Sequence, residues 1–232
     1  MTNKSISVVL VHGAWHDSWC WHLVGERLSA AGVDWIAPDL PMNSLREDQE
    51  IIRALVSDPG RGFVVAGHSR GARVMSFATF GAPSVRQLVF LACDVPEPGK
   101  ADDRERRPMP LAARAMVPAP DGYMVIDPAL APAFFYGDCD PALVAAAVSR
   151  LRRTRWETDA DVAGLEVGWK SIPSTFILSR RDNCVNPDDQ RRVAAKVDRL
   201  IELDASHSAM MSQPDAVTAV IIDRVRTAAE TA

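Results

Sequence analysis

A serine between two glycines is the first feature that could do chemistry. Residues 67–71 read Gly-His-Ser-Arg-Gly, and the apolar run at 62–66 before them is typical of a strand. A helix-like stretch at 70–80 follows directly. A strand, a sharp turn and a helix in this order lift a serine hydroxyl clear of a sheet, where it can attack a carbonyl carbon. The pattern predicts Ser69 as a nucleophile, and the alternative is an ordinary glycine turn with an incidental serine.

A carboxylate and a histidine follow in the order that such a serine needs. Asp182 comes after an expected strand at 172–178, and His207 comes after an expected strand at 199–203. Of the five histidines, only His207 follows this acid. We therefore expect His207 to take the proton of Ser69 while Asp182 accepts a hydrogen bond from its Nδ1.

Other assignments stay open at this point. Asp94, just past an expected strand at 86–92, is a rival for the acid. Asp188 and Asp189 are also near, but they fall in the first turn of an expected helix, where acidic residues are favoured for structural reasons. His207 could also be a loop residue without a chemical role.

Backbone N–H groups must stabilise the oxygen that becomes negative during such an attack. Gly13 follows the expected strand at 6–11 and lets the chain turn sharply, so that the N–H of Ala14 can point toward the serine. The second donor is expected to be the N–H of Arg70, the residue after the nucleophile.

The elements that must position these residues alternate between apolar strands and helices, which is typical of a mostly parallel α/β sheet covered on both faces. Because the carboxyl ends of parallel strands share one edge of the sheet, the three side chains should meet there. We expect strands at 6–11, 33–37, 62–66, 86–92, 172–178 and 199–203, and helices at 17–31, 44–57, 70–80, 187–197 and 214–229.

One interval breaks this alternation. Prolines divide it into short helical pieces such as 141–153, and a structureless loop of that length is improbable in a compact domain. We therefore predict a core of residues 1–95 and 171–232 with an inserted helical cap at 96–170. The charged stretch at 101–107 is interpreted as a solvated hinge.

A small-molecule substrate should lie between the serine turn and this cap. Aromatic residues and one histidine are the candidates for contacting it, although they fit the core of the cap equally well. These candidates are Trp15, His16, Trp19, Phe134, Phe135, Tyr136 and Trp156.

Composition narrows the class of protein. The chain has 232 residues, a net charge of -4 and interspersed charges, which disfavours nucleic acid and anionic membranes as partners. The apolar run near the N-terminus is too short for a signal peptide or a membrane span, so we expect a cytoplasmic monomer or homodimer. Four scattered cysteines show no metal-ligand spacing, and neither a metal nor an organic cofactor is expected.

With these motifs in place, the chain resembles the α/β-hydrolase superfamily, and especially the plant methylesterase and hydroxynitrile lyase group with its bacterial esterase relatives. The matching segments are 9–16 with 19–21, then 67–71, then 207–214. The resemblance implies an α/β-hydrolase fold and a serine esterase that cleaves a small to medium, apolar carboxylic ester through an acyl-enzyme.

Two positions bear on the reaction. Lyases that resemble this sequence carry Thr where Gly13 stands and Lys where Ser208 stands, whereas the esterases keep Gly and lack that Lys. Ester hydrolysis is therefore expected, with a lyase or carbon–carbon bond hydrolase, or a non-catalytic ligand-binding protein on this scaffold, as alternatives. Arg70 departs from the apolar residue usual in relatives. It either forms a local salt bridge, which we favour, or biases the pocket toward acidic substrates.

Overall fold

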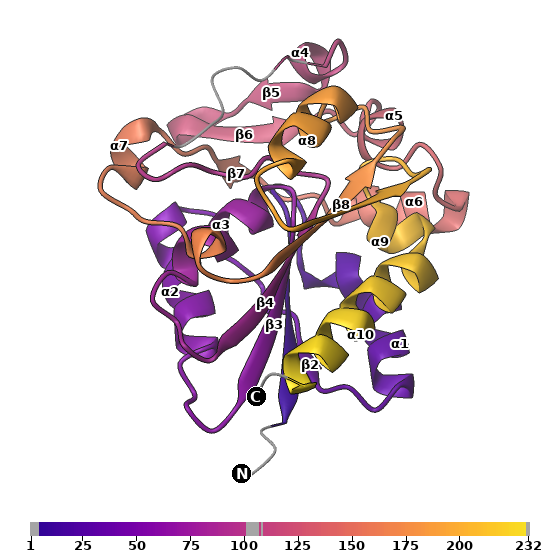
Figure 1. The fold of residues 1–232 in the computed structure, drawn as a ribbon. Coiled ribbons are helices and arrows are strands. Elements are labelled where there is room, and N and C mark those ends of the chain that lie inside the picture. The colour runs from indigo at the N-terminus through magenta and orange to yellow at the C-terminus, as the bar shows by residue number, and fades with distance from the viewer. Residues whose placement is uncertain (1–4, 101–106, 108, 231–232) are drawn as a thin grey trace.

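A six-stranded parallel sheet runs through the centre of the molecule (Figure 1). The structure is a computed structural model that describes residues 5–100, 107 and 109–230. The strand order is β2-β1-β3-β4-β8-β9, and every neighbouring pair is parallel. The expected number of strands is confirmed: β1 Ile6–Val11, β2 Trp35–Ile36, β3 Gly62–His68, β4 Val85–Leu91, β8 Ser174–Ser179 and β9 Arg199–Leu203.

The central strands are apolar on both faces because each face has its own hydrophobic core. In β1, Val8 and Leu10 point into one core, whereas Val9 and Val11 point into the other. All four side chains are fully buried. Successive residues of a strand point to opposite faces, so a strand covered on both sides appears in the sequence as an unbroken apolar run.

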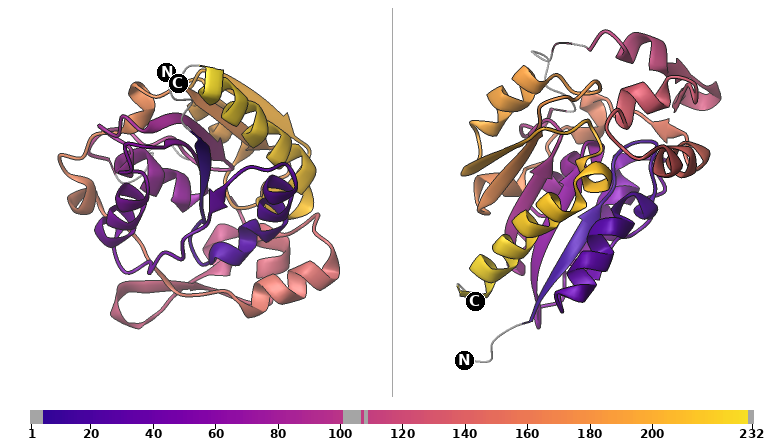
Figure 2. Two further views of the ribbon diagram at one scale, coloured as in Figure 1. Left: turned by 90° about the horizontal axis from the view of Figure 1, so that it is seen from below. Right: turned by 90° about the vertical axis from the view of Figure 1, so that its right-hand side faces the viewer.

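Helices cover both faces of the sheet (Figure 2). Helices α1 and α10 pack together on one face, and α2 and α3 pack together on the other. The helix expected at 17–31 instead begins as a 3-10 turn, Ser18–Trp21, capped by the side chain of Asp17. The helices of the core are α1 His22–Ala30, α2 Leu45–Leu55, α3 Arg70–Ala78, α8 Pro187–Ala194, α9 Ala209–Ser212 and α10 Pro214–Glu230.

Residues 96–170 are named here the cap segment, and the strands and most of the helices in its described part lie over the carboxyl edge of the sheet (Figure 1). The cap expected to be helical also contains a small antiparallel sheet of strands β5, β6 and β7 beside its helices. Strands of two to four residues are too short to show an alternating pattern. The elements are α4 Ala112–Ala115, β5 Met116–Pro118, β6 Tyr123–Ile126, α5 Ala131–Phe135, α6 Pro141–Ser149, β7 Thr154–Arg155 and α7 Asp159–Val162, with 3-10 turns at Pro120–Gly122 and Gly168–Lys170.

The hinge expected at 101–107 lies, except for Arg107, outside the described residues. Within the described part of the chain, no helix has the length and apolar character that crossing a bilayer requires.

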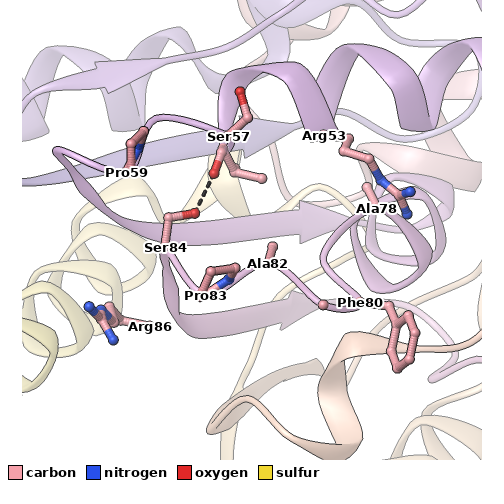
Figure 3. A pocket seen from close by; sticks show the side chains of 11 residues that line it. Arg53, Ser57, Pro59, Ala78, Phe80, Ala82, Pro83, Ser84 and Arg86 are labelled. Carbon is pink, nitrogen blue, oxygen red and sulfur yellow. Dashed lines mark hydrogen bonds between the residues drawn. The ribbon is translucent and has the colours of Figure 1, made fainter.

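A surface cavity of about 530 Å³ lies near the amino ends of the strands, opposite the carboxyl edge of the sheet (Figure 3). It opens between the end of α2 and the loop from α3 to β4, and Arg53, Phe80 and Ser84 are among the residues that line it. That loop leads into the amino end of β4, whereas Ser69 follows the carboxyl end of β3. The cavity is therefore separate from the predicted catalytic residues.

Candidate active site

Ser69 lies in the sharp turn between β3 and α3. Its backbone has φ 51° and ψ -125°, a conformation that few side chains adopt. Such a residue carries about 1–3 kcal/mol of strain, and the surrounding structure must hold it. A hydrogen bond from the N–H of Ser69 to the carbonyl oxygen of Leu91, at 2.9 Å, helps to stabilise this conformation. The structure thus contains the sharp turn expected between the strand and the helix, with Ser69 in it.

Two glycines let the strand and the helix approach each other at this turn. A Cβ atom on Gly67 would lie 2.5 Å from the Cα of Ala72. A Cβ atom on Gly71 would lie 2.4 Å from the carbonyl oxygens of Val11 and His12. These obstacles are backbone atoms, so any larger residue would push α3 away from the sheet.

His207 and Asp182 form a buried hydrogen-bonded pair. His207 Nδ1 donates to Asp182 Oδ2 at 2.8 Å, and neither side chain is more than 1% exposed. Asp182 Oδ1 accepts from the N–H groups of Cys184 and Val185 at 2.7 and 2.9 Å. Gln190 Nε2 donates to Asp182 Oδ2 at 2.8 Å. With these four donors around it, the carboxylate is fixed as an acceptor for the imidazole.

His68 connects the serine turn to the loop that carries His207. Its Nε2 donates to the carbonyl oxygen of His207 at 3.1 Å, and the two ring centroids are 4.6 Å apart. Because His68 directly precedes Ser69, this bond holds the two loops side by side at the carboxyl edge of the sheet. The structure therefore places the loop that carries His207 beside the turn that carries Ser69, and the catalytic roles of Ser69, His207 and Asp182 remain predictions.

The buried histidines differ in the direction of their pKa shifts. Burial lowers the pKa of His207, but the charge of Asp182, followed by the contribution of Cys184 and by the hydrogen bond to Asp182, outweighs burial and raises the pKa above the usual 6.5. At His12 and His16 burial dominates and lowers the pKa to about 4. Burial also lowers the pKa of His68 well below its usual range. Among these four buried side chains, only His207 has a raised pKa.

The other three carboxylates considered for the acid interact with arginine residues. Asp94 Oδ2 lies 2.8 Å from Arg73 Nη2. Asp188 Oδ2 accepts from Arg107 Nη2 at 3.1 Å, and Asp189 Oδ2 accepts from the backbone N–H of Arg107 at 2.7 Å. Of the four candidates, the one that hydrogen-bonds to the imidazole is Asp182.

The side chain of Arg70 takes part in a buried ion-pair network. Its Nη1 lies 2.6 Å from Asp48 Oδ2, and its Nε pairs with Glu157 of the cap segment. Arg73 also pairs with Glu157, at 3.3 Å, and with Asp94. The local salt bridge favoured for Arg70 is therefore what the structure contains, and its charge is neutralised inside the protein.

We expect the Arg70→Met variant to lower the free energy of unfolding by about 3–5 kcal/mol, because it leaves the buried carboxylate of Asp48 without its partner. Burial already raises the pKa of Asp48, while Arg70 opposes that rise. Without Arg70 the carboxyl takes up a proton more readily, so the loss should shrink as the pH falls. Urea unfolding at several pH values measures both effects.

The matched control is Arg199→Met. Arg199 pairs with Asp223 at 3.0 Å, but both side chains are about half exposed. An exposed pair contributes at most about 1 kcal/mol. An Arg70→Met variant no less stable than this control would show that the buried network does not stabilise the fold.

The loop after β1 passes directly beside the serine. A Cβ atom on Gly13 would lie 3.0 Å from the Cβ of Ser69. The backbone N–H of Arg70 stands at the start of α3, where helical N–H groups have no partner within the helix. The loop of Gly13 and the start of α3 are both suitable places for an oxyanion donor. The roles of the Ala14 and Arg70 N–H groups remain predictions.

The residues expected around the substrate are mostly packed between this loop and the cap segment. Trp156 is half-buried and stacks on Trp15 with ring centroids 5.5 Å apart, whereas Trp19 stacks on His22 at 4.4 Å. Contact of these residues with a substrate stays a prediction, because burial also assigns them a packing role. The most buried members, at 5% exposure or less, are Trp15, His16, Phe134, Phe135 and Tyr136.

Sequence reasoning does not find the residues that support the site indirectly. Gln190 holds Asp182, but a glutamine in the first turns of a helix has no distinguishing pattern. His68 is recognisable only as a neighbour of the nucleophile, and its bond to residue 207 spans 139 positions. Such partners become visible only when the fold brings them together.

Comparisons with known proteins agree with the fold. A model described as the alpha/beta hydrolase family matches residues 8–220. Methylesterase 7 of Arabidopsis thaliana is 37% identical over 111 residues, which cover 41% of this chain and 42% of that protein. Methylesterase 3 of the same plant is 24% identical over 93% of this chain and 94% of that protein. The chain thus spans about two fifths of the length of the first curated relatives that it matches.

Among solved structures, polyneuridine aldehyde esterase superimposes with a TM-score of 0.82. The match covers 95% of this chain and 98% of that one, at 20% sequence identity. At this identity the likeness establishes a shared fold.

Proposed function

The chain belongs to the alpha/beta hydrolase family, and from this premise we propose that it is a carboxylic ester hydrolase. Ser69 is the nucleophile, His207 the general base and acid, and Asp182 the carboxylate that orients the imidazole. The observation that supports this most is the buried hydrogen bond between His207 and Asp182. The strained backbone of Ser69 supports it as well.

The first half of the reaction forms an acyl-enzyme. His207 Nε2 takes the proton of the Ser69 hydroxyl while Oγ bonds to the ester carbonyl carbon, and the carbonyl oxygen becomes negative. The N–H groups of Ala14 and Arg70 stabilise that oxygen. When the carbonyl re-forms, the bond to the alkoxide breaks, His207 gives its proton to the alkoxide, and the alcohol leaves.

The second half releases the acid. A water molecule gives a proton to His207 Nε2 while its oxygen attacks the acyl carbon. The bond between the acyl group and Ser69 then breaks, and the proton returns from His207 to Oγ. Asp182 keeps its hydrogen bond to Nδ1 and stabilises the imidazolium that forms in each half.

We propose an uncharged, largely apolar ester as the substrate. The charges of Arg70 and Arg73 are engaged by Asp48, Glu157 and Asp94, so these cations do not favour an anionic substrate. The names of the curated relatives, methylesterase and esterase, fit an ester with a small alcohol.

Gly13 supports hydrolysis over the lyase alternative. A Cβ atom there would lie 3.0 Å from both Ser69 Cβ and His68 Nδ1. The site therefore lacks room for the threonine of the lyases that the sequence resembles, unless these neighbours shift.

The test is turnover of a panel of methyl and aryl esters with acyl chains of increasing length, beside cyanohydrins and ketones. We expect one acid and one alcohol from each ester consumed, with the highest rates for small to medium apolar acyl groups. A fluorophosphonate should add one phosphonyl group to the protein, whereas an analogue without a leaving group should not. A protein that neither cleaves these esters nor accepts the label would overturn the proposal.

A further inference from the structure

Trp15, two residues after Gly13, has a backbone conformation that needs support. Its φ is 63°, in the left-handed region, where a bulky aromatic residue is a rare outlier. A strained conformation of this kind persists only when contacts with the surrounding structure stabilise it. The holding groups come from the cap segment.

Every hydrogen-bonding group of Trp15 is bonded to the cap segment. Its backbone N–H donates to Thr154 Oγ1 at 2.7 Å, and its carbonyl oxygen accepts from the N–H of Arg152 at 2.8 Å. Its indole Nε1–H donates to the carbonyl oxygen of Met124 at 3.1 Å. Thr154 and Met124 are direct partners across β7 and β6. The small sheet of the cap therefore presents two acceptors to one residue of the loop.

The carbonyl oxygen of Ala14 is held as well. His16 Nδ1 donates to it at 2.7 Å, and the hydroxyl of Tyr136 donates to His16 Nε2 at 2.8 Å. Tyr136 belongs to the cap segment, and both rings are buried. The pKa of His16 is about 4 because of burial, so the ring stays neutral and keeps one donor and one acceptor nitrogen at neutral pH.

The peptide group that joins Ala14 to Trp15 is thus fixed at both ends. Its carbonyl oxygen binds His16 and its N–H binds Thr154. Since the N–H of Trp15 is engaged by Thr154, it does not compete with the N–H of Ala14, the predicted oxyanion donor. Fixing the following peptide limits the torsions of Ala14 and so limits the direction of that donor.

We propose that Thr154 is a positioning residue for the oxyanion hole. Through the N–H of Trp15, the cap segment sets the direction of the Ala14 N–H before the substrate reacts. This inference rests on the proposed ester hydrolysis. Its consequence appears in the transition state, because the negative charge on the carbonyl oxygen develops only there.

The hydroxyl of Thr154 can be removed while the shape of the side chain is kept. Thr154 is fully buried, and its Oγ1 also donates to Met42 Sδ at 3.2 Å. In Thr154→Val a methyl group replaces the hydroxyl, so the acceptor for Trp15 is lost. In Thr154→Ser the acceptor remains.

We expect Thr154→Val to lower kcat by about 10- to 100-fold, less than the loss of an entire oxyanion donor, with KM changed less than about threefold. Thr154→Ser should recover kcat to within about threefold of the unmodified protein. The inhibition constant of a trifluoromethyl ketone, whose adduct carries the oxyanion, should rise in parallel with the fall in kcat. Binding of an unreactive amide of the same shape should not change.

Several outcomes would overturn the proposal: an unchanged kcat in Thr154→Val, a change confined to KM, or a serine variant as slow as the valine variant. If Thr154→Val does not fold by circular dichroism, Tyr136→Phe decides, because it weakens the hold on the same peptide through His16. There a fall in kcat with constant KM supports the inference, and an unchanged kcat refutes it. If the unmodified protein cleaves no ester, the proposed function fails, and this result is distinct from unaffected variants of an active esterase.

Discussion

Replacing Ser69 with alanine is expected to lower kcat for ester hydrolysis by about 10⁴- to 10⁶-fold. The hydroxyl forms the bond to the acyl carbon, and neither the imidazole of His207 nor the oxyanion donors can form it instead. The remaining rate should come from binding and oxyanion stabilisation alone. Turnover of an aryl ester measures the loss, and the burst of alcohol that accompanies formation of the acyl-enzyme should vanish with it.

The matched control is Ser76→Ala. Ser76 lies in the same helix as the serine turn and is fully buried, so its replacement removes a hydroxyl from the same element. This variant should keep the rate within about threefold of the unmodified protein, since surrounding packing changes little on loss of one oxygen. If Ser69→Ala hydrolyses the ester as fast as Ser76→Ala, then Ser69 is not the nucleophile.

Replacing Asp182 with asparagine is expected to lower kcat by about 10⁴-fold. All four groups that contact the carboxylate are donors: the imidazole, two backbone N–H groups and the amide of Gln190. The asparagine amide nitrogen cannot accept from any of them. If the amide nitrogen takes the place of Oδ2, His207 loses its acceptor. If it takes the place of Oδ1, the hydrogen bonds from the N–H groups of Cys184 and Val185 are lost. Full activity in Asp182→Asn would contradict the role of this residue.

The same replacement should move the pH dependence. A base works only when neutral, so the rate should rise with pH through the pKa of His207, which Asp182 raises above 6.5. Without the carboxylate, burial lowers that pKa, and the acid limb of kcat/KM should shift to lower pH. The neighbouring His12 and His16, with pKa values of about 4, cannot produce a limb above 6.5. A rate that stays constant from neutral pH to about pH 4 would rule out His207 as the base.

The four inner strands of the sheet are predictable from the sequence because they are buried on both faces. Ile6–Val11 has the expected bounds, and so does the edge strand Arg199–Leu203, although its residues are exposed or only partly buried. The edge strand Trp35–Ile36 is shorter than the expected 33–37, since these two residues are the ones that pair with β1. The order of serine, carboxylate and histidine along the chain predicts Ser69, Asp182 and His207, and the hydrogen bond between His207 and Asp182 is compatible with it.

The cap segment and its contacts were not predictable in the same way. Its strands contain two to four residues, which is too few to show a periodic pattern. Arg70 pairs with Glu157, which is 87 positions away in the sequence, and Trp15 bonds to Thr154, which is 139 positions away. Aromatic residues that could face a ligand could equally form a core, and only burial shows that Phe134 and Phe135 are packed.

The three hydrogen bonds between Trp15 and the cap segment have a consequence for protein engineering. A foreign cap grafted onto this core to admit bulkier esters would remove the acceptors supplied by Thr154 and Met124. Selectivity and turnover would then change together in the chimera. A graft that carries residues 13–16 along with its cap keeps the two matched, and exchanging both pieces as one module is the sounder design.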